Sequence, residues 1–510
     1  MGYLHPILTP EAAIEFEKRR LFRRDHEWTA MQRAGRALGR AILADLPEVL
    51  PTPRRLRVLL AVGKGHTGRD AMLAAADIRH RLPDMDVFLL PSGKRDDWRT
   101  LTTQAFRQLE ETGPVLDLNL PTAEQYGFDI LLDGLLGMSF TPPLKRDLRD
   151  MIRALNAHRR IAFRAAVDLP SGLGDSECLR ADFTYATGIV KAPAVEPVNL
   201  GDVGRLRYLD LGFFDSQAAI EEAGESGRSV IDASILRPLT TARARATDKR
   251  HFGHLMVIGG ARTMPGALLM NVEAAVRSGV GLVTVFAPES TAASLAGRVP
   301  EAMWVPMPET PDGGLALEGR GLILPYLPRA TALLAGSGMG SEAETLALLA
   351  EILAQRAVPV AIDADGLRPQ VVEAATSAKQ PMVLTPHLGE FRRLTGADAN
   401  GFDDEIRACA NRTGATIILK GPITRVSDGE RLGYSVEGGP VLARGGSGDI
   451  LAGLLGGLLA QPDEDTFEVA CRAAVWHARA ADALARARGS HAVRTTELLD
   501  FLNPAVREVV

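Results

Sequence analysis

Asp449 ends a glycine-rich run, Gly445-Gly-Ser-Gly-Asp449, which leads into an apolar stretch from Ile450 to Ala460. This composition predicts a helix whose first backbone N–H groups have no side chain over them and are free to bind a ligand. The positive end of the helix dipole makes such a terminus a binding site for phosphate. A carboxylate there would repel phosphate, which argues against a purely structural aspartate. Asp449 is better suited to take a proton from a hydroxyl that is about to receive a phosphoryl group. The plainer alternative is a glycine-rich loop capped by Asp449.

Four further polar clusters follow short apolar runs in the second half of the chain. They are Gly336-Ser-Gly-Met-Gly340, Asp363-Ala-Asp-Gly366, Thr385-Pro-His-Leu-Gly-Glu390 and Lys420-Gly-Pro-Ile-Thr424. Ligands of open α/β sheets bind at the carboxyl ends of the strands, so we expect these clusters to converge on the Asp449 site. His387 is placed to contact a ligand, whereas Lys420 and Thr424 suit a nucleotide phosphate. Asp363 and Asp365 could orient a cation, and the alternative for them is an acidic turn at a helix start. The alternative for Lys420 is a solvated lysine in a turn.

The elements that must position these residues alternate along the chain. Strands are expected at residues 57–62, 86–90, 130–132 and 161–167, and then at 254–258, 281–286, 332–335, 358–362 and 382–384. Helical stretches such as 70–80 and 266–278 lie between them, which indicates parallel sheets with helices on both faces. Residues 216–248 have weak periodicity and are interpreted as a junction. The sequence therefore predicts an α/β protein of two domains.

Length and composition limit the class of protein further. A chain of 510 residues is too long for one core, and a net charge of −5 without a long basic block predicts no nucleic-acid partner. Cys178, Cys409 and Cys471 are far apart and show neither a metal pattern nor a disulfide framework, which is typical of a reducing cytoplasm. We expect no secretory signal and no membrane span, because no apolar run is long enough.

The motifs of the second half also occur together in a known family. From about Lys249 to the C-terminus the sequence resembles the ADP-dependent NAD(P)H-hydrate dehydratases, which have the ribokinase-like fold. The motifs that carry the resemblance, in order, are His254-Leu-Met-Val-Ile-Gly-Gly260, Pro265-Gly-Ala267, Arg277-Ser-Gly-Val-Gly-Leu-Val283, Asp363-Ala-Asp-Gly-Leu367, Thr385-Pro-His-Leu-Gly-Glu390, Leu419-Lys-Gly421, Gly445-Gly-Ser-Gly-Asp449 and the helix with His477.

This resemblance implies repair of damaged nicotinamide cofactors. The substrate would be the 6-hydroxy hydrate of NADH or NADPH (NADHX or NADPHX), with ADP or ATP as phosphoryl donor and Mg²⁺ as the metal. Asp449 would deprotonate the ring hydroxyl, which would take the terminal phosphoryl group and then leave as phosphate. The resemblance assigns nucleotide contacts to Lys420, Gly421, Pro422, Ile423, Thr424 and Gly448. It assigns hydrate contacts to Ala267, Gly338, His387 and Asp449.

The first half contains Gly63-Lys-Gly-His-Thr-Gly68 after a strand, which has the spacing of a dinucleotide fingerprint, with Asp84 or Asp86 at about the expected distance. A second interpretation covers more of this half. Residues 8–214 resemble the NAD(P)H-hydrate epimerases, and we expect a Rossmann-like three-layer sandwich. The supporting segments are Met31-Gln-Arg-Ala-Gly35, Asp133-Gly-Leu-Leu-Gly137, Val167-Asp-Leu-Pro-Ser-Gly172, residues 184–193, Gly201-Asp-Val-Gly204 and Leu209-Asp-Leu-Gly212.

The epimerase resemblance implies interconversion of the R and S hydrates by opening and reclosing at the hydrated carbon. Asp168 would serve as acid or base and Lys191 would support it electrostatically; the structural alternative is a Pro-Ser-Gly turn capped by Asp168. The implied hydrate contacts are His66, Thr67, Gly68, Arg69, Asp70, Gly137 and Asp168. Potassium would be held by Thr67, Asp133 and Ser171.

One segment departs from the epimerase pattern. His66-Thr-Gly-Arg-Asp-Ala71 stands where the family reads Asn-Asn-Gly-Gly-Asp-Gly, so Thr67 replaces a potassium-ligating asparagine and Arg69 replaces a glycine. An arginine could pair with phosphate, or its bulk could close the pocket. The loop after Gly137 also lacks the family's second glycine. Epimerase activity is therefore left open.

The sequence thus predicts an epimerase-like domain at residues 1–215, a junction at 216–248 and a dehydratase domain at 249–510, in a homo-oligomer that acts on a small molecule. One alternative is a ribokinase-like kinase that phosphorylates a hydroxylated vitamin precursor. Another makes the first half a non-catalytic module for nucleotide binding and oligomerisation. An oxidoreductase that uses the 63–68 loop is disfavoured, because it leaves the second half unexplained.

Overall fold

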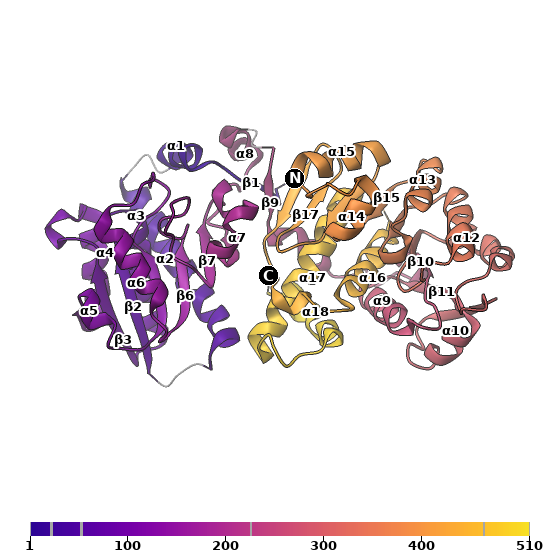
Figure 1. Cartoon of the computed structure of the whole chain (residues 1–510), viewed down its shortest axis with the longest axis horizontal. Helices are drawn as coiled ribbons and strands as arrows, with labels where there is room; N and C mark the ends of the chain where they lie inside the picture. Colours follow the sequence, from indigo (N-terminus) through magenta and orange to yellow (C-terminus); the bar gives the residue numbers. More distant parts are fainter. Residues whose placement is uncertain (1, 21–23, 52–54, 225–226, 463–464, 509–510) are drawn as a thin grey trace. The chain divides into compact units, whose positions relative to one another are not determined.

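The computed structural model describes residues 2–20, 24–51, 55–224, 227–462 and 465–508. The chain forms two compact units, Met1–Asp232 with Ala485–Ser490, and Ala233–Leu484 with His491–Val510. Each unit has a largely parallel sheet flanked by helices (Figure 1). The predicted fold class, α/β with two domains, is confirmed; the predicted limits at residues 215 and 249 stay a prediction.

The first unit is a three-layer sandwich around a parallel sheet of strand order β4-β3-β2-β5-β6-β7-β8. The strands are β2 Leu56–Val62, β3 Met85–Pro91, β4 Val115–Asp117, β5 Phe128–Gly134, β6 Ile161–Val167, β7 Phe183–Thr187 and β8 Arg205–Leu209. Outside this sheet, β1 Leu4–Pro6 pairs with β9 Ser229–Ile231 in an antiparallel ladder. Strands β2 and β5 are nearly continuous apolar runs because helices cover both of their faces.

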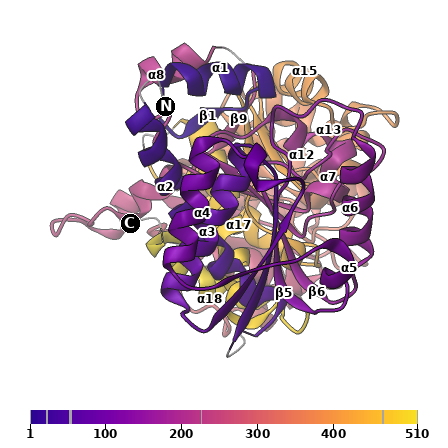
Figure 2. The ribbon, with the colours of Figure 1, turned by 90° about the vertical axis from the view of Figure 1, so that its left-hand side faces the viewer.

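Helices of the first unit form the two outer layers (Figure 2). One face packs against α2 Arg24–Val49, α3 His66–Arg81 and α4 Thr100–Glu111, and the other against α6 Arg146–Ala157. The remaining helices are α1 Pro10–Arg20, α5 Leu120–Ala123, α7 Leu200–Val203 and α8 Gln217–Ala223. Gly35 lets α2 approach α3 closely, because a Cβ there would lie 2.4 Å from Leu73 Cβ.

In the second unit the strands pair in the order β18-β17-β16-β15-β14-β13-β10-β11-β12. They are β10 His254–Ile258, β11 Leu282–Pro288, β12 Met303–Met307, β13 Ala332–Ala335, β14 Val360–Ile362, β15 Met382–Leu384, β16 Thr416–Leu419, β17 Thr424–Ser427 and β18 Leu432–Ser435. The ladders from β12 to β16 are parallel, and β17 and β18 add antiparallel strands at one side. The carboxyl ends of β13 to β16 therefore meet at one edge of the sheet.

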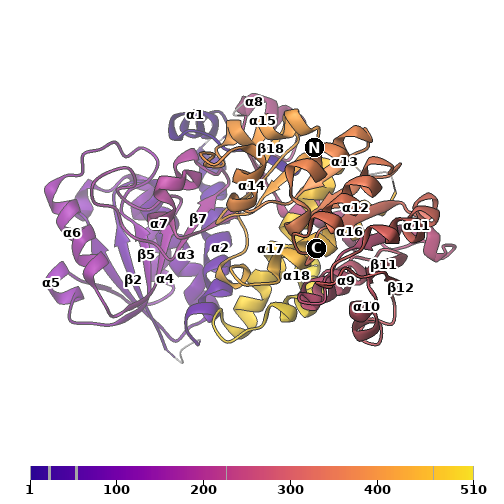
Figure 3. The same ribbon diagram turned by 45° about the vertical axis from the view of Figure 1, so that its right-hand side comes forward.

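Helices cover both faces of the second sheet (Figure 3). One face packs against α12 Ala343–Ala354, α13 Pro369–Ser377, α14 Leu388–Thr395 and α15 Asp403–Thr413. Helix α16, Ser447–Leu459, contacts β13, β14 and α9 Pro265–Arg277. The other helices are α10 Glu289–Leu295, α11 Arg320–Ile323, α17 Thr466–Arg488 and α18 Leu498–Arg507.

One local expectation needs correction. The helix expected at residues 70–80 begins at His66, so residues 66–71 lie in its first two turns. Residues 216–248 contain α8, β9 and a 3₁₀ segment at Ala233–Thr240, and their interpretation as a junction stays a prediction. Among the helices that the structure describes, none combines the length and the apolar character needed to cross a bilayer.

Two candidate active sites

Asp449 lies in the first turn of α16, whose N-cap Gly446 has φ +91°. Glycine adopts this left-handed conformation without steric strain. Further along α16, a Cβ on Gly453 would lie 2.1 Å from Asn271 O, and one on Gly457 would lie 1.9 Å from Ser278 Oγ. The glycines of the apolar stretch are therefore packing residues that let α9 fix the position of α16.

An ion pair lies at the strand ends that face this helix terminus. Lys420 Nζ is 2.9 Å from Asp363 Oδ1 and 3.8 Å from Glu390 Oε2. Asp363 Oδ1 also accepts a hydrogen bond from Thr385 Oγ1 at 2.6 Å. Burial lowers the pKa of Lys420, but the carboxylates of Asp363, Glu390 and Asp449 outweigh it, and the pKa ends above its ordinary value. Lys420 is thus a charged, held ammonium and not a solvated turn residue.

The ionisation of Asp449 is tuned by these neighbours. Burial raises the pKa of Asp449 to about 6, and the Asp363 carboxylate adds to this effect. Lys420 and a hydrogen bond from the Ser337 hydroxyl act in the opposite direction. A carboxylate with a pKa close to neutrality combines the ionised form with a useful affinity for a proton, as a general base requires.

Glycines keep the space around these charges open. A Cβ on Gly448 would lie 3.2 Å from Lys420 Nζ and 4.0 Å from Asp363 Oδ2. Gly338 has φ +62°, and a Cβ there would lie 3.0 Å from Ala267 Cβ. The structure therefore brings Gly448 beside Lys420 and Asp363, and Gly338 beside Ala267.

His387 forms the N-cap of α14 through a reciprocal capping box. Its Nδ1 accepts hydrogen bonds from the backbone N–H groups of Gly389 at 2.9 Å and Glu390 at 3.3 Å, while Glu390 Oε2 accepts from the His387 N–H at 2.8 Å. The His387 side chain is 59% exposed, as predicted for a residue outside the core. Its backbone pairs with that of Lys420, which keeps the two strand ends together.

The other residues of the Lys420 segment lie further out. Gly421 and Pro422 are exposed, Ile423 is half-buried, and Thr424 is the first residue of β17. The 420–424 turn therefore presents a short accessible surface next to the ion pair.

In the first unit, Asp168 and Lys191 form a buried ion pair in which Lys191 Nζ donates to Asp168 Oδ1. Asp168 directly follows β6 and has φ +70°, a conformation that costs a residue other than glycine conformational energy. Lys191 is 1% exposed. The strained backbone and the buried charges favour the functional interpretation of Asp168 over a simple turn cap.

Two more carboxyl groups lie near this pair. Burial raises the pKa of Glu17 to about 7, with Lys191 opposing and Asp168 adding to the shift. Burial also raises the pKa of Asp70 to about 7, against the opposing effect of Arg69. The buried Asp70 Oδ1 finds no hydrogen-bond partner among the described residues.

The predicted potassium ligands are arranged around Asp133. Asp133 Oδ2 accepts from the Ser171 N–H at 2.7 Å, and Oδ1 accepts from Ser171 Oγ at 2.5 Å and from the Leu135 N–H at 3.2 Å. Thr67 Oγ1 lies against Gly137, where a Cβ would be 2.1 Å from it. Protein donors make two hydrogen bonds to Asp133 Oδ1 and one to Oδ2, so the carboxylate keeps about one lone pair for an ion.

Arg69, in the first turn of α3, is 2% exposed. Its Nη1 donates to Glu27 Oε1 at 3.3 Å, whereas Nε and Nη2 are buried and have no partner among the described residues. Burial lowers the pKa of Arg69, and the carboxylates of Asp70 and Glu27 oppose this shift. His66 is exposed and lies 3.3 Å from Arg99 Nη1. Arg69 is helical and has no positive φ, so its backbone is unstrained at this position.

Comparison with known proteins now decides the family. Residues 255–504 match the family model described as NAD(P)H-hydrate dehydratase, and residues 28–192 match the YjeF-related protein N-terminus. The chain is 33% identical to a bifunctional NAD(P)H-hydrate repair enzyme of Gloeobacter violaceus, covering 89% of each chain. It is 31% identical to that of Moorella thermoacetica, covering 89% of this chain and 88% of the relative. The chain belongs to the bifunctional NAD(P)H-hydrate repair enzymes.

Among solved structures, a ribokinase-like superfamily protein from Enterococcus faecalis is similar over 56% of this chain and 96% of its own, with 27% identity and a TM-score of 0.48. An ADP/ATP-dependent NAD(P)H-hydrate dehydratase from Bacillus subtilis, co-crystallised with ATP and Mg²⁺, covers 55% of this chain and 98% of its own at 24% identity and a TM-score of 0.47.

Two residues that lie beside the sites of this repair enzyme were not singled out from the sequence. Asn271 contacts Asp449, and Glu17 lies near Asp168 and Lys191. Ser337 belongs to the 336–340 segment that was expected at the Asp449 site, but no role was predicted for its hydroxyl. Helix α1 reaches the latter site because Leu8 exchanges backbone hydrogen bonds with Val190 and Ala192. No motif spacing signals such contacts, because they join distant parts of the chain.

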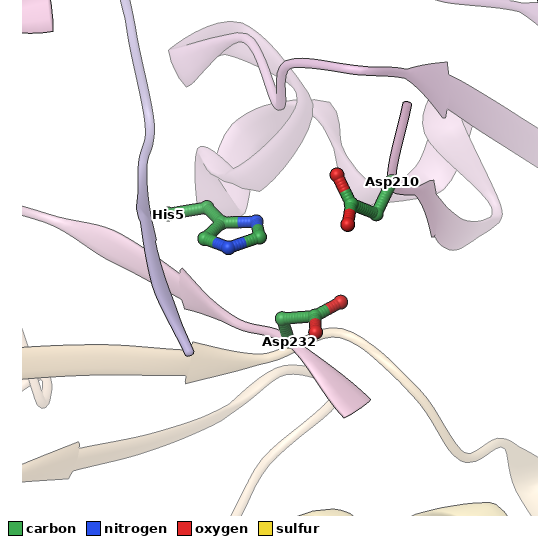
Figure 4. A group of neighbouring side chains, drawn as sticks. All are labelled: His5, Asp210 and Asp232. Atoms are coloured by element: carbon green, nitrogen blue, oxygen red, sulfur yellow. The ribbon is translucent and has the colours of Figure 1, made fainter. Parts of the chain in front are cut away.

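A further polar cluster of the repair enzyme, His5, Asp210 and Asp232, has ligand-type atoms within 4.8 Å of one another (Figure 4). Both ring nitrogens of His5 are already engaged, Nδ1 by Tyr208 OH at 2.7 Å and Nε2 by Gly2 O at 3.1 Å. Asp210 Oδ1 accepts from the Gly212 N–H at 2.9 Å. Protein hydrogen bonds therefore already engage His5 and Asp210.

Proposed function

We propose that the second unit dehydrates the S hydrate of NAD(P)H at the expense of ADP or ATP. The observation that carries this proposal is the position of Asp449, with its pKa of about 6, at the N-terminus of α16 beside the ammonium of Lys420. A proton acceptor, an anion-binding helix terminus and a fixed cation together suit phosphoryl transfer to a hydroxyl group.

In this mechanism Asp449 takes the proton of the ring hydroxyl, and the hydroxyl oxygen bonds to the terminal phosphorus of ADP as the bond to AMP breaks. The backbone N–H groups around Gly448 and the Lys420 ammonium offset the charge on the transferred group. The ring nitrogen lone pair then expels orthophosphate as the carbon–oxygen bond breaks, which leaves an iminium. The neighbouring carbon loses a proton to the departing phosphate, and this step restores the dihydropyridine. The products are NAD(P)H, AMP and orthophosphate.

Separate groups of residues around Asp449 are proposed to bind the nucleotide and the hydrate. Lys420, Gly421, Pro422, Ile423, Thr424 and Gly448 are proposed to contact the nucleotide, and Ala267, Gly338 and His387 the hydrate. When bound, Mg²⁺ would neutralise phosphate charge. In proteins it is commonly held by one carboxylate together with phosphate oxygens and water. Asp365 is the proposed holder, since its charge adds to the raised pKa of Asp449 and its Oδ2 is fixed by the Gly340 N–H at 2.9 Å.

For the first unit we propose epimerisation of the hydrates, with Asp168 moving the proton and Lys191 holding its carboxylate. The buried pair and the adjoining carboxyl groups of Glu17 and Asp70 support this role. The proposed substrate contacts are His66, Thr67, Gly68, Arg69, Asp70 and Gly137. No step is routed through potassium, because Asp133 and Ser171 bond to each other.

The recovery of NADH absorbance at 340 nm from a mixed R/S hydrate preparation, with ADP and Mg²⁺, tests both proposals. Rapid recovery of the whole pool is expected if both units are active. Recovery that stops after the S fraction, and then follows spontaneous epimerisation, would overturn the epimerase proposal alone. Failure of the wild-type protein to restore any absorbance, or full activity in Asp449→Asn, would overturn the dehydratase proposal or its base.

The alternative of a small-molecule kinase makes a different prediction for phosphate. A kinase leaves a stable phosphate ester, whereas the dehydratase releases orthophosphate in equal amount to the NADH restored. We also propose a cytoplasmic location, supported by three buried free thiols, and a homo-oligomer, which sedimentation velocity would test.

A further inference from the structure

Asn271, a fully buried residue of α9, contacts the backbone of the proposed base. Its Nδ2 donates to Ser337 Oγ at 3.0 Å and to the backbone carbonyl of Asp449 at 3.3 Å. Ser337 is itself 3% exposed, and its hydroxyl lowers the pKa of the Asp449 carboxylate as a hydrogen-bond donor. The three residues form one chain of hydrogen bonds.

The orientation of the Asn271 amide is fixed by this chain. A backbone carbonyl only accepts hydrogen bonds, so the amide nitrogen must face Asp449 O, and Asn271 Oδ1 must point away. Asn271 Oδ1 is buried and has no partner among the described residues. An unpaired buried acceptor destabilises a fold, and an apolar residue would fill this place without that cost. The fold alone therefore does not explain an asparagine at this position.

The close packing of α9 on α16 makes this contact possible. Gly453, four residues after Asp449, leaves no side chain between the helices, and its Cβ would collide with Asn271 O at 2.1 Å. Asn271 is thereby held against the backbone of the turn that carries Asp449. Ser337 comes from the loop after β13, between Gly336 and Gly338, whose φ values of +117° and +62° fix the loop.

We propose that Asn271 is a positioning residue for Asp449, which holds the Ser337 hydroxyl and the Asp449 backbone so that the hydroxyl orients the carboxylate toward the reacting hydroxyl of the hydrate. This inference rests on the proposed role of Asp449 as base. Ser337 is the link through which Asn271 acts, because it accepts from Asn271 and donates to Asp449.

The other charged groups around Asp449 stay in place when this chain is cut. Asp363 and Asp365 face it from the end of β14, and Lys420 from the end of β16. His477 of α17 lies 3.4 Å from Ser447 Oγ, and burial lowers its pKa to about 4, so it is neutral. Loss of the Ser337 donor therefore raises the pKa of Asp449, because the hydrogen bond favours the ionised form.

The test uses two single variants of the full-length protein, Asn271→Leu and Ser337→Ala. The leucine is close in size and removes the unpaired acceptor, so it should raise the melting temperature while lowering kcat. We expect kcat to fall about tenfold in both variants, with little change in KM for ADP. The acid limb of the pH profile of kcat should move upward by about one unit, so that high pH restores part of the loss.

Ser278→Ala is the matched control, since Ser278 is another buried hydroxyl of this region that donates to Ala275 O at 2.7 Å. It should leave the acid limb unchanged. An unshifted limb in both Asn271→Leu and Ser337→Ala would overturn the positioning role even if kcat falls. If Asn271→Leu does not fold, Ser337→Ala decides alone. Activity that survives in Asp449→Asn would instead show that the base itself is wrongly assigned.

Discussion

Lys420 Nζ and Asp363 Oδ1 lie 2.9 Å apart at the carboxyl ends of β16 and β14, and the same ammonium lies close to where a Gly448 side chain would start. Asp363 is 2% exposed, and its carboxylate keeps the lysine charged in spite of burial. The pair thus places a fixed positive charge in front of the N-terminus of α16. This arrangement would draw the terminal phosphate of a nucleotide toward Asp449.

The dehydratase rate should fall in acid as Asp449 takes up a proton. Because its pKa is raised to about 6, the base is ionised above that pH and protonated below it. We therefore expect kcat for the S hydrate to be half-maximal near pH 6 and to reach a plateau toward pH 8. Stopped-flow measurement of NADH formation with saturating ADP gives this profile. A flat profile between pH 5 and 8 would contradict the assignment.

Gly448→Ala should lower activity without lowering stability. The new Cβ would lie 3.2 Å from Lys420 Nζ, in the space proposed for the phosphate, whereas the residue is helical and alanine is favoured over glycine by about 1 kcal/mol. We expect KM for ADP to rise at least about tenfold in steady-state kinetics. Calorimetric unfolding of the same samples measures their stability. Gly445→Ala is the control, because a Cβ there meets nothing within 4 Å. Equal effects of the two substitutions would contradict the proposed phosphate position.

Lys191→Met should destabilise the first unit and stop epimerisation. The substitution leaves the Asp168 carboxylate buried without its partner, which costs about 3 kcal/mol. Asp168→Asn is milder for the backbone, since asparagine tolerates the φ of +70°, but it removes the charge that we propose to move the proton. Urea unfolding, monitored by proteolysis of the first unit, measures the loss of stability. The exposed Lys145, changed to Met, should have no effect on either property.

Arg69→Met decides what the buried guanidinium does. Its Nε and Nη2 have no partner among the described residues, so we expect them to bind the substrate diphosphate. Loss of charged hydrogen bonds of about 1.5–3 kcal/mol should raise KM for the R hydrate at least about tenfold and leave the dehydratase reaction unchanged. Faster epimerisation in the variant would show instead that the arginine obstructs the pocket. Arg146, which is 93% exposed, provides the control Arg146→Met.

The sequence by itself determined the two α/β units, most strands of their sheets and which strand ends lie beside each other near Asp449. Local signals suffice for these: apolar runs mark strands such as Ile161–Val167, and glycines followed by Asp449 mark a helix terminus. Strand ends that are far apart in the chain meet because parallel sheets bring their carboxyl ends to one edge. That rule predicts that Lys420, Asp363 and His387 lie together.

Only the tertiary structure decided how these groups are tuned. Asn271 reaches Asp449 from α9, and Glu17 approaches Lys191 through the pairing of Leu8, so no spacing in the chain predicts these contacts. The first turn of α3 could not be recognised because helix packing overrides the loop signal of Gly65 and Gly68. Burial sets the pKa values of Asp449 and Asp70, and burial is a property of the packed chain, not of a residue type.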